Sequence, residues 1–207
     1  MTFKLLALPL VTALALLAAG CSKPGEPPAA GTSSTSASTS TGAAPAPVAV
    51  SGSSYDTVAN TGKGFTVGSM MSAQPVYVLF EPQCPHCGHL WNASLELHSK
   101  VKFVWMPVAF NQGKSLSQAA TLLSAADPLA TMTEHEKSLL SGNGGITAMD
   151  SVSPEMAQAI KTNTDLMTTL GIDSVPYILA KNRRTGEIVS NNGALDTPAL
   201  AKLLGVD

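Results

Sequence analysis

The amino-acid sequence predicts an α/β fold for residues 55–207. Two runs of apolar, β-branched and aromatic residues, VYVLF at 76–80 and VKFVWMPV at 101–108, have the composition of buried strands. The segment 87–100 between them has helical character, which indicates a right-handed βαβ unit. Later in the chain, 176–180 and 187–190 form a predicted hairpin across a polar turn.

Helices fill the rest of this segment. Residues 115–140 predict two or more short helices with a break near Asp127-Pro128, and the run GNGG at 142–145 predicts a loop. Ser153-Pro154-Glu155 has the residues of a helix start, so a helix is expected to run to Leu170 and stop at Gly171.

The remaining elements are short. A last helix is expected from Thr197-Pro198 through Leu204, and residues 66–71 are expected to add only an edge strand. The complete order, with its helical insert between the βαβ unit and the hairpin, resembles a thioredoxin fold.

The front of the chain has the pattern of an export signal. Lys4 precedes an apolar run at 5–19 that is too short for a comfortable transmembrane helix and ends in small residues. The sequence LAAGC at 17–21 resembles the lipobox of bacterial lipoproteins, which implies cleavage after residue 20 and lipid on Cys21. Acyl chains there would hold the protein at a membrane surface. The alternative is a plain signal peptide with Cys21 incidental.

A linker and one domain follow. Residues 21–54 are mainly Ser, Thr, Ala, Gly and Pro, which bury too little surface to offset their ordering entropy, so a flexible tether is expected. A structured stalk is the alternative. Residues 55–207 have the length of one domain. The net charge is −2 and no basic stripe is visible, so nucleic acid is not an expected partner.

The CPHC motif at 84–87 carries the chemistry. Cys84 is expected where a strand becomes a helix, near unsatisfied N–H groups that stabilise a thiolate, and His86 can add a positive charge. Lowering the thiol pKa by about three units favours the dithiol by roughly 4 kcal/mol, or roughly 90 mV. Pro85 and His86 are thus expected to make the disulfide a good electron acceptor, with Cys84 attacking and Cys87 resolving.

Other uses of the two cysteines are weaker. Gly88 after Cys87 excludes the CxxCH pattern of a haem. His89, His98 and His135 lack the ligand spacing of a zinc site. A two-residue disulfide clip closes too small a loop to stabilise much. A non-enzymatic metal carrier that uses the two thiolates stays open as an alternative, and no cofactor beyond the redox-active pair is expected.

Several segments between 74 and 204 resemble the periplasmic Dsb thiol:disulfide oxidoreductases: FEPQCPHC, VKFVWMPVAF, SLSQAATLLSAADPLA and LGIDSVPYIL. Glu81, three residues before Cys84, is closest to the DsbC and DsbG group, whereas His86 and Val175 lean toward DsbA. The resemblance implies that Cys84 attacks substrate and that Cys87 resolves the mixed disulfide. It also implies that Val175-Pro176 is a cis-Pro loop that binds the substrate chain. A trans proline opening an edge strand is the alternative.

These observations lead to ranked hypotheses. The first is an exported, membrane-anchored oxidant of cysteine-containing proteins that a membrane partner reoxidises. The second is a reductase or sulfenic-acid repair protein of DsbG type, kept reduced by a membrane donor. About twenty residues separate the tether from the similar region, too few for the dimerisation domain of DsbC and DsbG, so a monomer is expected. Ser22 does not resemble an inner-membrane retention signal, which leaves the outer membrane open as the site of the anchor.

Overall fold

The computed structural model describes residues 48–49 and 51–207. The predicted signal peptide, Cys21 and most of the predicted linker lie outside the described residues. The strands are β1 Val48–Ala49, β2 Phe65–Gly68, β3 Val76–Phe80, β4 Lys102–Pro107, β5 Tyr177–Lys181 and β6 Ile188–Asn192. The helices are α1 Gly52–Thr61, α2 Pro85–Leu95, α3 Ser115–Leu123, α4 Pro128–Leu140, α5 Pro154–Leu170 and α6 Thr197–Leu204.

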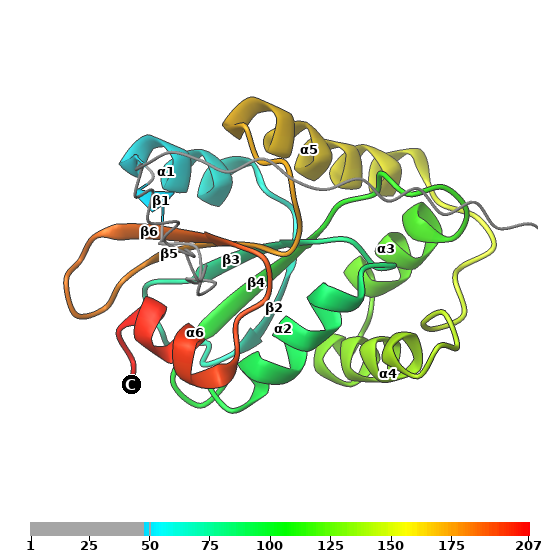
Figure 1. Ribbon diagram of the computed structural model, residues 1–207. Helices are drawn as coiled ribbons and strands as arrows, with labels where there is room; N and C mark the ends of the chain where they lie inside the picture. The colour runs from blue at the N-terminus through cyan, green and yellow to red at the C-terminus, as the bar shows by residue number, and fades with distance from the viewer. Residues whose placement is uncertain (1–47, 50) are drawn as a thin grey trace, which may run out of the picture. The chain divides into compact units, whose positions relative to one another are not determined.

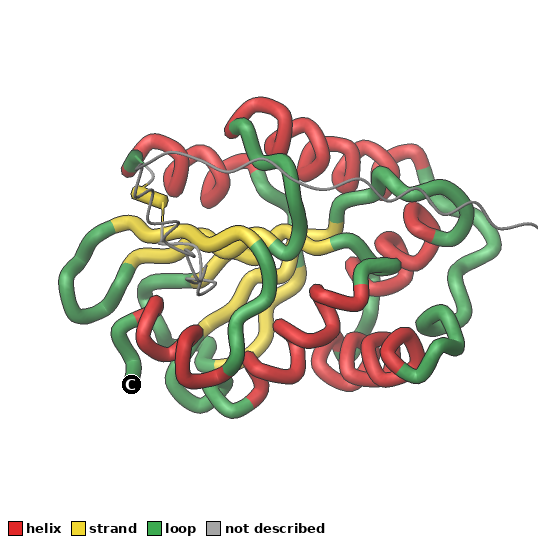
Figure 2. The backbone as a smooth tube through the Cα atoms, viewed as in Figure 1, coloured by secondary structure: helices red, strands yellow, loops and turns green. Residues whose placement is uncertain are grey.

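The strands form one mixed sheet in the order β1-β6-β5-β3-β4-β2. Strand β3 is parallel to β4, and helix α2 connects them, so the predicted βαβ unit is confirmed. Strands β5 and β6 form the predicted hairpin, and β5 pairs antiparallel with β3. Strand β2 pairs with β4 at the sheet edge, as expected for the segment near 66–71. Helices α1 and α5 cover one face, whereas α2 and α6 cover the other (Figure 1, Figure 2).

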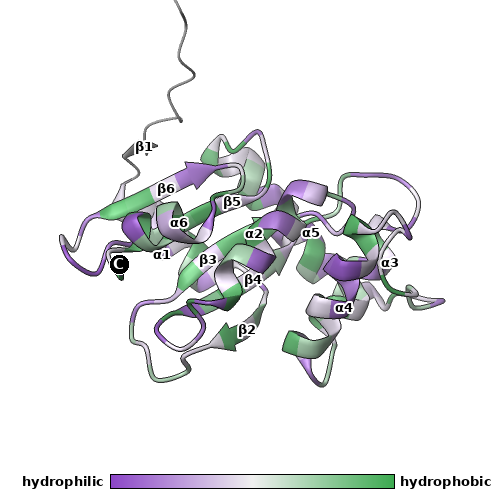
Figure 3. Ribbon diagram, turned by 60° about the horizontal axis from the view of Figure 1, so that its bottom comes forward, coloured by the Kyte–Doolittle hydropathy of each residue, from purple (hydrophilic) through white to green (hydrophobic). Residues whose placement is uncertain are grey.

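All five residues of β3 are buried, because both faces of the strand are covered. Val76, Val78 and Phe80 belong to the larger core cluster, with side chains from α2 and α6. Tyr77 and Leu79 point to the opposite face and pack with side chains from α1 and α5. The helices carry both hydrophobic and hydrophilic residues, as amphipathic helices on a sheet do (Figure 3). The central strand that leads into CPHC is therefore fixed from both sides.

Local signals predicted most helix ends. The side chain of Ser153 accepts a hydrogen bond from the amide of Met156 at the start of α5. Gly171 ends that helix with φ 66°, a left-handed conformation that glycine adopts without a Cβ clash. The helical insert is two helices, α3 and α4, with the break at Asp127, whose side chain caps α4. Helix α6 is capped by Asp196, one residue before the predicted start.

Helix α1 was not predicted. Its sequence, GSSYDTVANT, is polar, and only Val58 in it is buried. Its first residues, 52–54, fall in the segment expected to be linker. Helix α2 ends at Leu95, earlier than the helical character of 87–100 indicated, and the chain continues in turns. Within the described residues, no helix is long and apolar enough to span a bilayer.

Candidate active site

The CPHC motif lies at the junction of β3 and α2, where the sequence placed it. Cys84 is the N-cap of α2 and Pro85 is its first residue, a position that needs no free N–H. The amide of Cys84 donates to the carbonyl of Glu81 at 3.0 Å, and the amide of Cys87 donates to the carbonyl of Cys84 at 3.0 Å. Cys84 is half-buried and Cys87 fully buried, both as free thiols. Cys84 alone of the two is therefore accessible to a partner.

The two sulfurs have opposite electrostatics. The pKa of Cys84 is lowered to about 6, chiefly by a hydrogen bond with the Cys87 side chain. Backbone hydrogen bonds from Cys87 and His86 and the charge of His86 also lower this pKa, and burial opposes them. Burial raises the pKa of Cys87, and the neighbouring Cys84 raises it further. At neutral pH the motif thus holds a thiolate at Cys84 and a thiol at Cys87.

The histidines lie apart from any cluster of metal ligands. His86 and His89 are exposed on α2, with ring centroids 6.3 Å apart. His98 is half-buried, and its ring packs against those of Trp91 and Phe103. Among the described residues, no group of three or more His, Cys, Asp or Glu side chains has the arrangement of a metal site.

The loop before β5 lies against the motif. The peptide bond between Val175 and Pro176 is cis, as the resemblance implied. The Sγ atom of Cys84 lies 3.8 Å from the carbonyl oxygen of Val175, although 91 positions separate the two residues. The amide of Gly193 donates to the carbonyl of Pro176 at 2.8 Å and ties the loop to the hairpin. Cys84, Cys87, Val175 and Pro176 therefore form one site.

Glu81 anchors the segment that enters the motif. It is fully buried, and its carboxylate accepts hydrogen bonds from the amides of Gln83, Phe110 and Asn111. The hydroxyl of Ser115, the first residue of α3, donates to both carboxylate oxygens, at 2.7 and 2.9 Å. The sequence marked Glu81 only through resemblance; its role as a hub between β3, the loop after β4 and the insert comes from the structure.

The insert makes two further polar contacts with this segment. The Nε2 atom of buried His135 donates to the carbonyl of Pro82 at 2.7 Å, while its Nδ1 accepts from the amide of Ile146 at 3.3 Å. This pairing is that of a neutral ring, and burial lowers the pKa of His135. The side-chain amide of Gln83 donates to that of Gln118 on α3. Helices α3 and α4 thus hold the residues just before Cys84.

A second buried acid, Glu136, was not predicted from the sequence to lie at the site. Neither of its carboxylate oxygens has a hydrogen-bond partner in the described part of the chain. It lies against Gly88, where an added Cβ would come within 2.6 Å of Oε2. Burial, reinforced by the charge of Cys84, raises its pKa to about 9. One signal was available: Glu136 follows Met132 by four positions, on the face of α4 that is buried.

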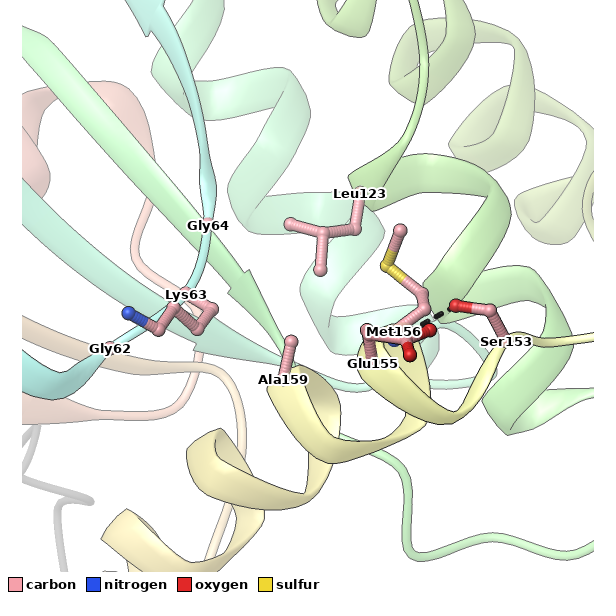
Figure 4. A pocket seen from close by; sticks show the side chains of 8 residues that line it. All are labelled: Gly62, Lys63, Gly64, Leu123, Ser153, Glu155, Met156 and Ala159. Carbon is pink, nitrogen blue, oxygen red and sulfur yellow. Dashed lines mark hydrogen bonds between the residues drawn. The ribbon is translucent and has the colours of Figure 1, made fainter.

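A surface cavity lies away from the motif. It has a volume of about 450 Å³ and lies between the segment 62–64 and the start of α5, with Leu123 and Met156 in its wall (Figure 4). None of the motif residues lines it. Glu155 lies in the first turn of α5, beside the Ser153 cap. The cavity is therefore not part of the CPHC site.

A CxxC pair at the start of a helix, opposite a cis proline, defines a thioredoxin-like redox site, and comparisons with known proteins agree. No protein-family model matches the chain. The protein is 28% identical over 134 residues to the thiol:disulfide interchange protein DsbG of Escherichia coli, covering 63% of this chain and 52% of that protein. It is 24% identical over 132 residues to DsbG of Pseudomonas aeruginosa, covering 63% of this chain and 50% of the relative.

The chain thus spans about half the length of the curated relatives it matches. Among solved structures, a periplasmic thioredoxin-like protein from Salmonella enterica superposes with a TM-score of 0.58 at 16% identity, covering 75% of this chain and 95% of that one. This similarity shows the thioredoxin-like fold. The predicted resemblance to Dsb-type thiol:disulfide interchange proteins is confirmed for this domain.

Proposed function

We propose that the protein is an exported thiol:disulfide oxidoreductase that exchanges the Cys84–Cys87 disulfide with thiols of substrate proteins, acting as an oxidant. The observation that carries this proposal is the lowered pKa of Cys84 beside the raised pKa of Cys87. A stabilised Cys84 thiolate favours the reduced dithiol, so the disulfide accepts electrons readily. The similarity to DsbG supports thiol:disulfide chemistry in either direction.

The exchange takes two steps. A substrate thiolate attacks the Sγ atom of Cys84, the Cys84–Cys87 bond breaks, and its electron pair stays on the Cys87 sulfur. A second substrate thiolate then attacks the substrate sulfur of the mixed disulfide and releases Cys84 as a thiolate. The substrate leaves with a new disulfide, and its two electrons remain on the Cys84–Cys87 pair. The carbonyl of Val175, 3.8 Å from the Cys84 sulfur, belongs to the backbone edge that would align the substrate chain.

The proposed cellular setting rests on the pattern of the N-terminal sequence. Cleavage after residue 20 and lipid on Cys21 would leave the domain in the cell envelope on a tether shorter than the predicted 21–54, because residues 48–49 and 52–54 belong to β1 and α1. A membrane redox partner would reoxidise the pair there, and the domain would act as a monomer. The thioredoxin-like protein from Salmonella is periplasmic, which supports an envelope location.

The second candidate is the reverse direction: a reductase or sulfenic-acid repair protein kept reduced by a membrane donor. Its support is that both curated relatives are DsbG proteins. The same residues would act, with Cys84 attacking an oxidised sulfur on the substrate and Cys87 resolving the mixed disulfide. The two candidates differ in the reduction potential of the pair.

The test is the reduction potential of the full chain, equilibrated in glutathione buffers, with Cys84→Ser as control. A potential above about −180 mV supports the oxidant, whereas one near about −270 mV overturns it in favour of the reductase. If the wild type has no defined couple but its reduced form binds copper or zinc stoichiometrically, a metal carrier replaces both.

A further inference from the structure

Thiol exchange leaves a buried negative charge on the Cys87 sulfur, which needs a proton. When its sulfur leaves Cys84, it carries a negative charge in a site where the residue is fully buried. Burial raises the pKa of this thiol, so an unprotonated sulfur is costly there. Cys84 meets a substrate thiolate at the partly open end of the motif, but Cys87 has no direct access to water. A buried group with a transferable proton would remove this cost.

The surroundings of Cys87 offer few such groups. Buried Glu81 is close, but both of its carboxyl oxygens already accept hydrogen bonds. His86 and His89, the other titratable side chains of α2, are exposed. Helix α3 and strand β2, which pack on α4, carry no titratable side chain. His135, next to Glu136 on α4, is already committed to Pro82 and Ile146 through both ring nitrogens.

Glu136 has the required geometry. It is fully buried, both carboxylate oxygens are without a hydrogen-bond partner among the described residues, and Oε2 lies against Gly88, the residue that follows Cys87. Gly88 makes this approach possible, since a Cβ there would lie 2.6 Å from that oxygen. Burying a carboxyl group without partners costs stability. Because this buried carboxyl group lies beside a redox pair and lowers stability, its position indicates a chemical role rather than a structural one.

We propose that Glu136, supplied by the helical insert, is the proton-transfer partner of Cys87. This inference rests on the proposed thiol exchange. As a substrate thiolate attacks Cys84 and the Cys84–Cys87 bond breaks, the electron pair goes to the Cys87 sulfur. That sulfur takes the carboxyl proton of Glu136 and leaves a carboxylate. When Cys87 attacks Cys84 in a mixed disulfide, the Cys87 proton returns to Glu136 as the substrate departs as a thiolate.

The resting state agrees with this role. Burial keeps the pKa of Glu136 well above neutral, so its carboxyl group holds a proton before the reaction. In the reduced pair the Cys84 thiolate raises this pKa further and Glu136 raises the pKa of Cys87, whereas in the disulfide neither sulfur titrates and burial alone acts on Glu136. Glu136 is therefore protonated before the Cys84–Cys87 disulfide opens, which is the first step of substrate oxidation.

The experiment follows a single turnover. The oxidised full chain is mixed with reduced glutathione, and opening of the Cys84–Cys87 disulfide is followed against pH in wild type, Glu136→Gln and Glu134→Gln. Glutamine has the shape of the protonated carboxyl group but no proton to transfer. We expect Glu136→Gln to slow opening on the order of 100-fold at neutral pH and to flatten the pH profile. Glu134, exposed on the same helix, is the matched control and should leave both unchanged.

A second readout separates proton transfer from structural damage. Alkylation of the Cys84 thiolate in the reduced protein should proceed at the wild-type rate in Glu136→Gln, because that sulfur needs no proton from Glu136. Equal opening rates for wild type and Glu136→Gln would overturn the inference while leaving the proposed function intact. No exchange by the wild type would instead overturn the proposed function. If Glu136→Gln does not fold, Glu136→Asp decides: a wild-type rate with an unshifted pH profile overturns the inference, and a slowed, shifted profile supports it.

Discussion

Glu81 and Glu136 are both fully buried carboxyl groups beside the CPHC motif, yet their surroundings are opposite. Glu81 accepts hydrogen bonds from three backbone amides and the Ser115 hydroxyl. Glu136 has no hydrogen-bond partner in the described part of the chain. The donors around Glu81 satisfy its carboxyl oxygens, whereas burial without donors favours the protonated form of Glu136.

This difference separates a structural acid from a chemical one. Glu81 connects the end of β3 to the loop after β4 and to α3 through hydrogen bonds that its carboxyl oxygens accept. Among the described residues Glu136 has no hydrogen bond of that kind, and its proposed role at the site is to supply a proton. Burial alone therefore does not reveal the role of an acid in this domain; the donors around it do.

The largest expected effect is on stability, and it should differ between the two acids. Glu81→Ala leaves several buried donors unpaired, so we expect the free energy of unfolding to fall by about 3–5 kcal/mol. Glu136→Met replaces an unpartnered acid by an apolar side chain, so we expect no loss, or a gain of about 1 kcal/mol. Urea unfolding of both variants measures this. Equal losses would mean that Glu136 is held by interactions like those of Glu81.

The second prediction concerns pH. The pKa of Glu136 is raised from 4.5 to about 9 in the folded protein, so the native state keeps a proton that the unfolded state releases between these values. Its contribution to stability is full below about pH 4.5 and is lost as the pH rises toward 9, by up to about 1.4 kcal/mol per unit. The difference in unfolding free energy between wild type and Glu136→Gln, measured from about pH 5 to 8, should fall with this slope. A constant difference would contradict it.

The third prediction tests the contact at Gly88. A Cβ there would also lie 3.1 Å from a side-chain carbon of Leu140, so Gly88→Ala should crowd α4 and destabilise by about 1–2 kcal/mol. Adding Glu136→Ala removes the closer clash, so the double variant should recover part of the loss. Chemical unfolding of both single variants and the double variant gives the coupling free energy, expected at about 1 kcal/mol. Additive losses would show that the two residues do not touch.

The smallest expected effect is at His86. Its charge is the last of the causes that lower the pKa of Cys84, so His86→Ala should raise that pKa by less than about one unit. Thiolate absorbance of the reduced protein, titrated around pH 6, measures the change. His89→Ala is the matched control and should leave the midpoint in place. A larger shift would make the histidine, rather than the hydrogen bond from Cys87, the main stabiliser of the thiolate.

The elements around the site were predictable because their signals are local. The apolar run 76–80, the Ser153-Pro154 start and the Gly171 stop of α5 each specify structure through neighbours in the chain. Helix α1 was missed because its sequence is polar and its place depends on packing against distant residues. Helix α5 could be predicted from its capping residues, whereas α1 has only one buried residue and therefore no apolar periodicity to detect.

The sequence by itself determined the order of elements from β3 to α6 and the position of CPHC at a helix start, while its resemblance to the Dsb proteins implied the loop at Val175-Pro176. The tertiary structure alone decided that Glu81 meets its donors and that Glu136, beside Gly88, meets none among the described residues. The physical reason is that burial and hydrogen bonding at these acids depend on residues far apart in the chain, such as Ser115, 34 positions from Glu81. No local pattern encodes which of the two buried carboxyl groups finds hydrogen-bond donors.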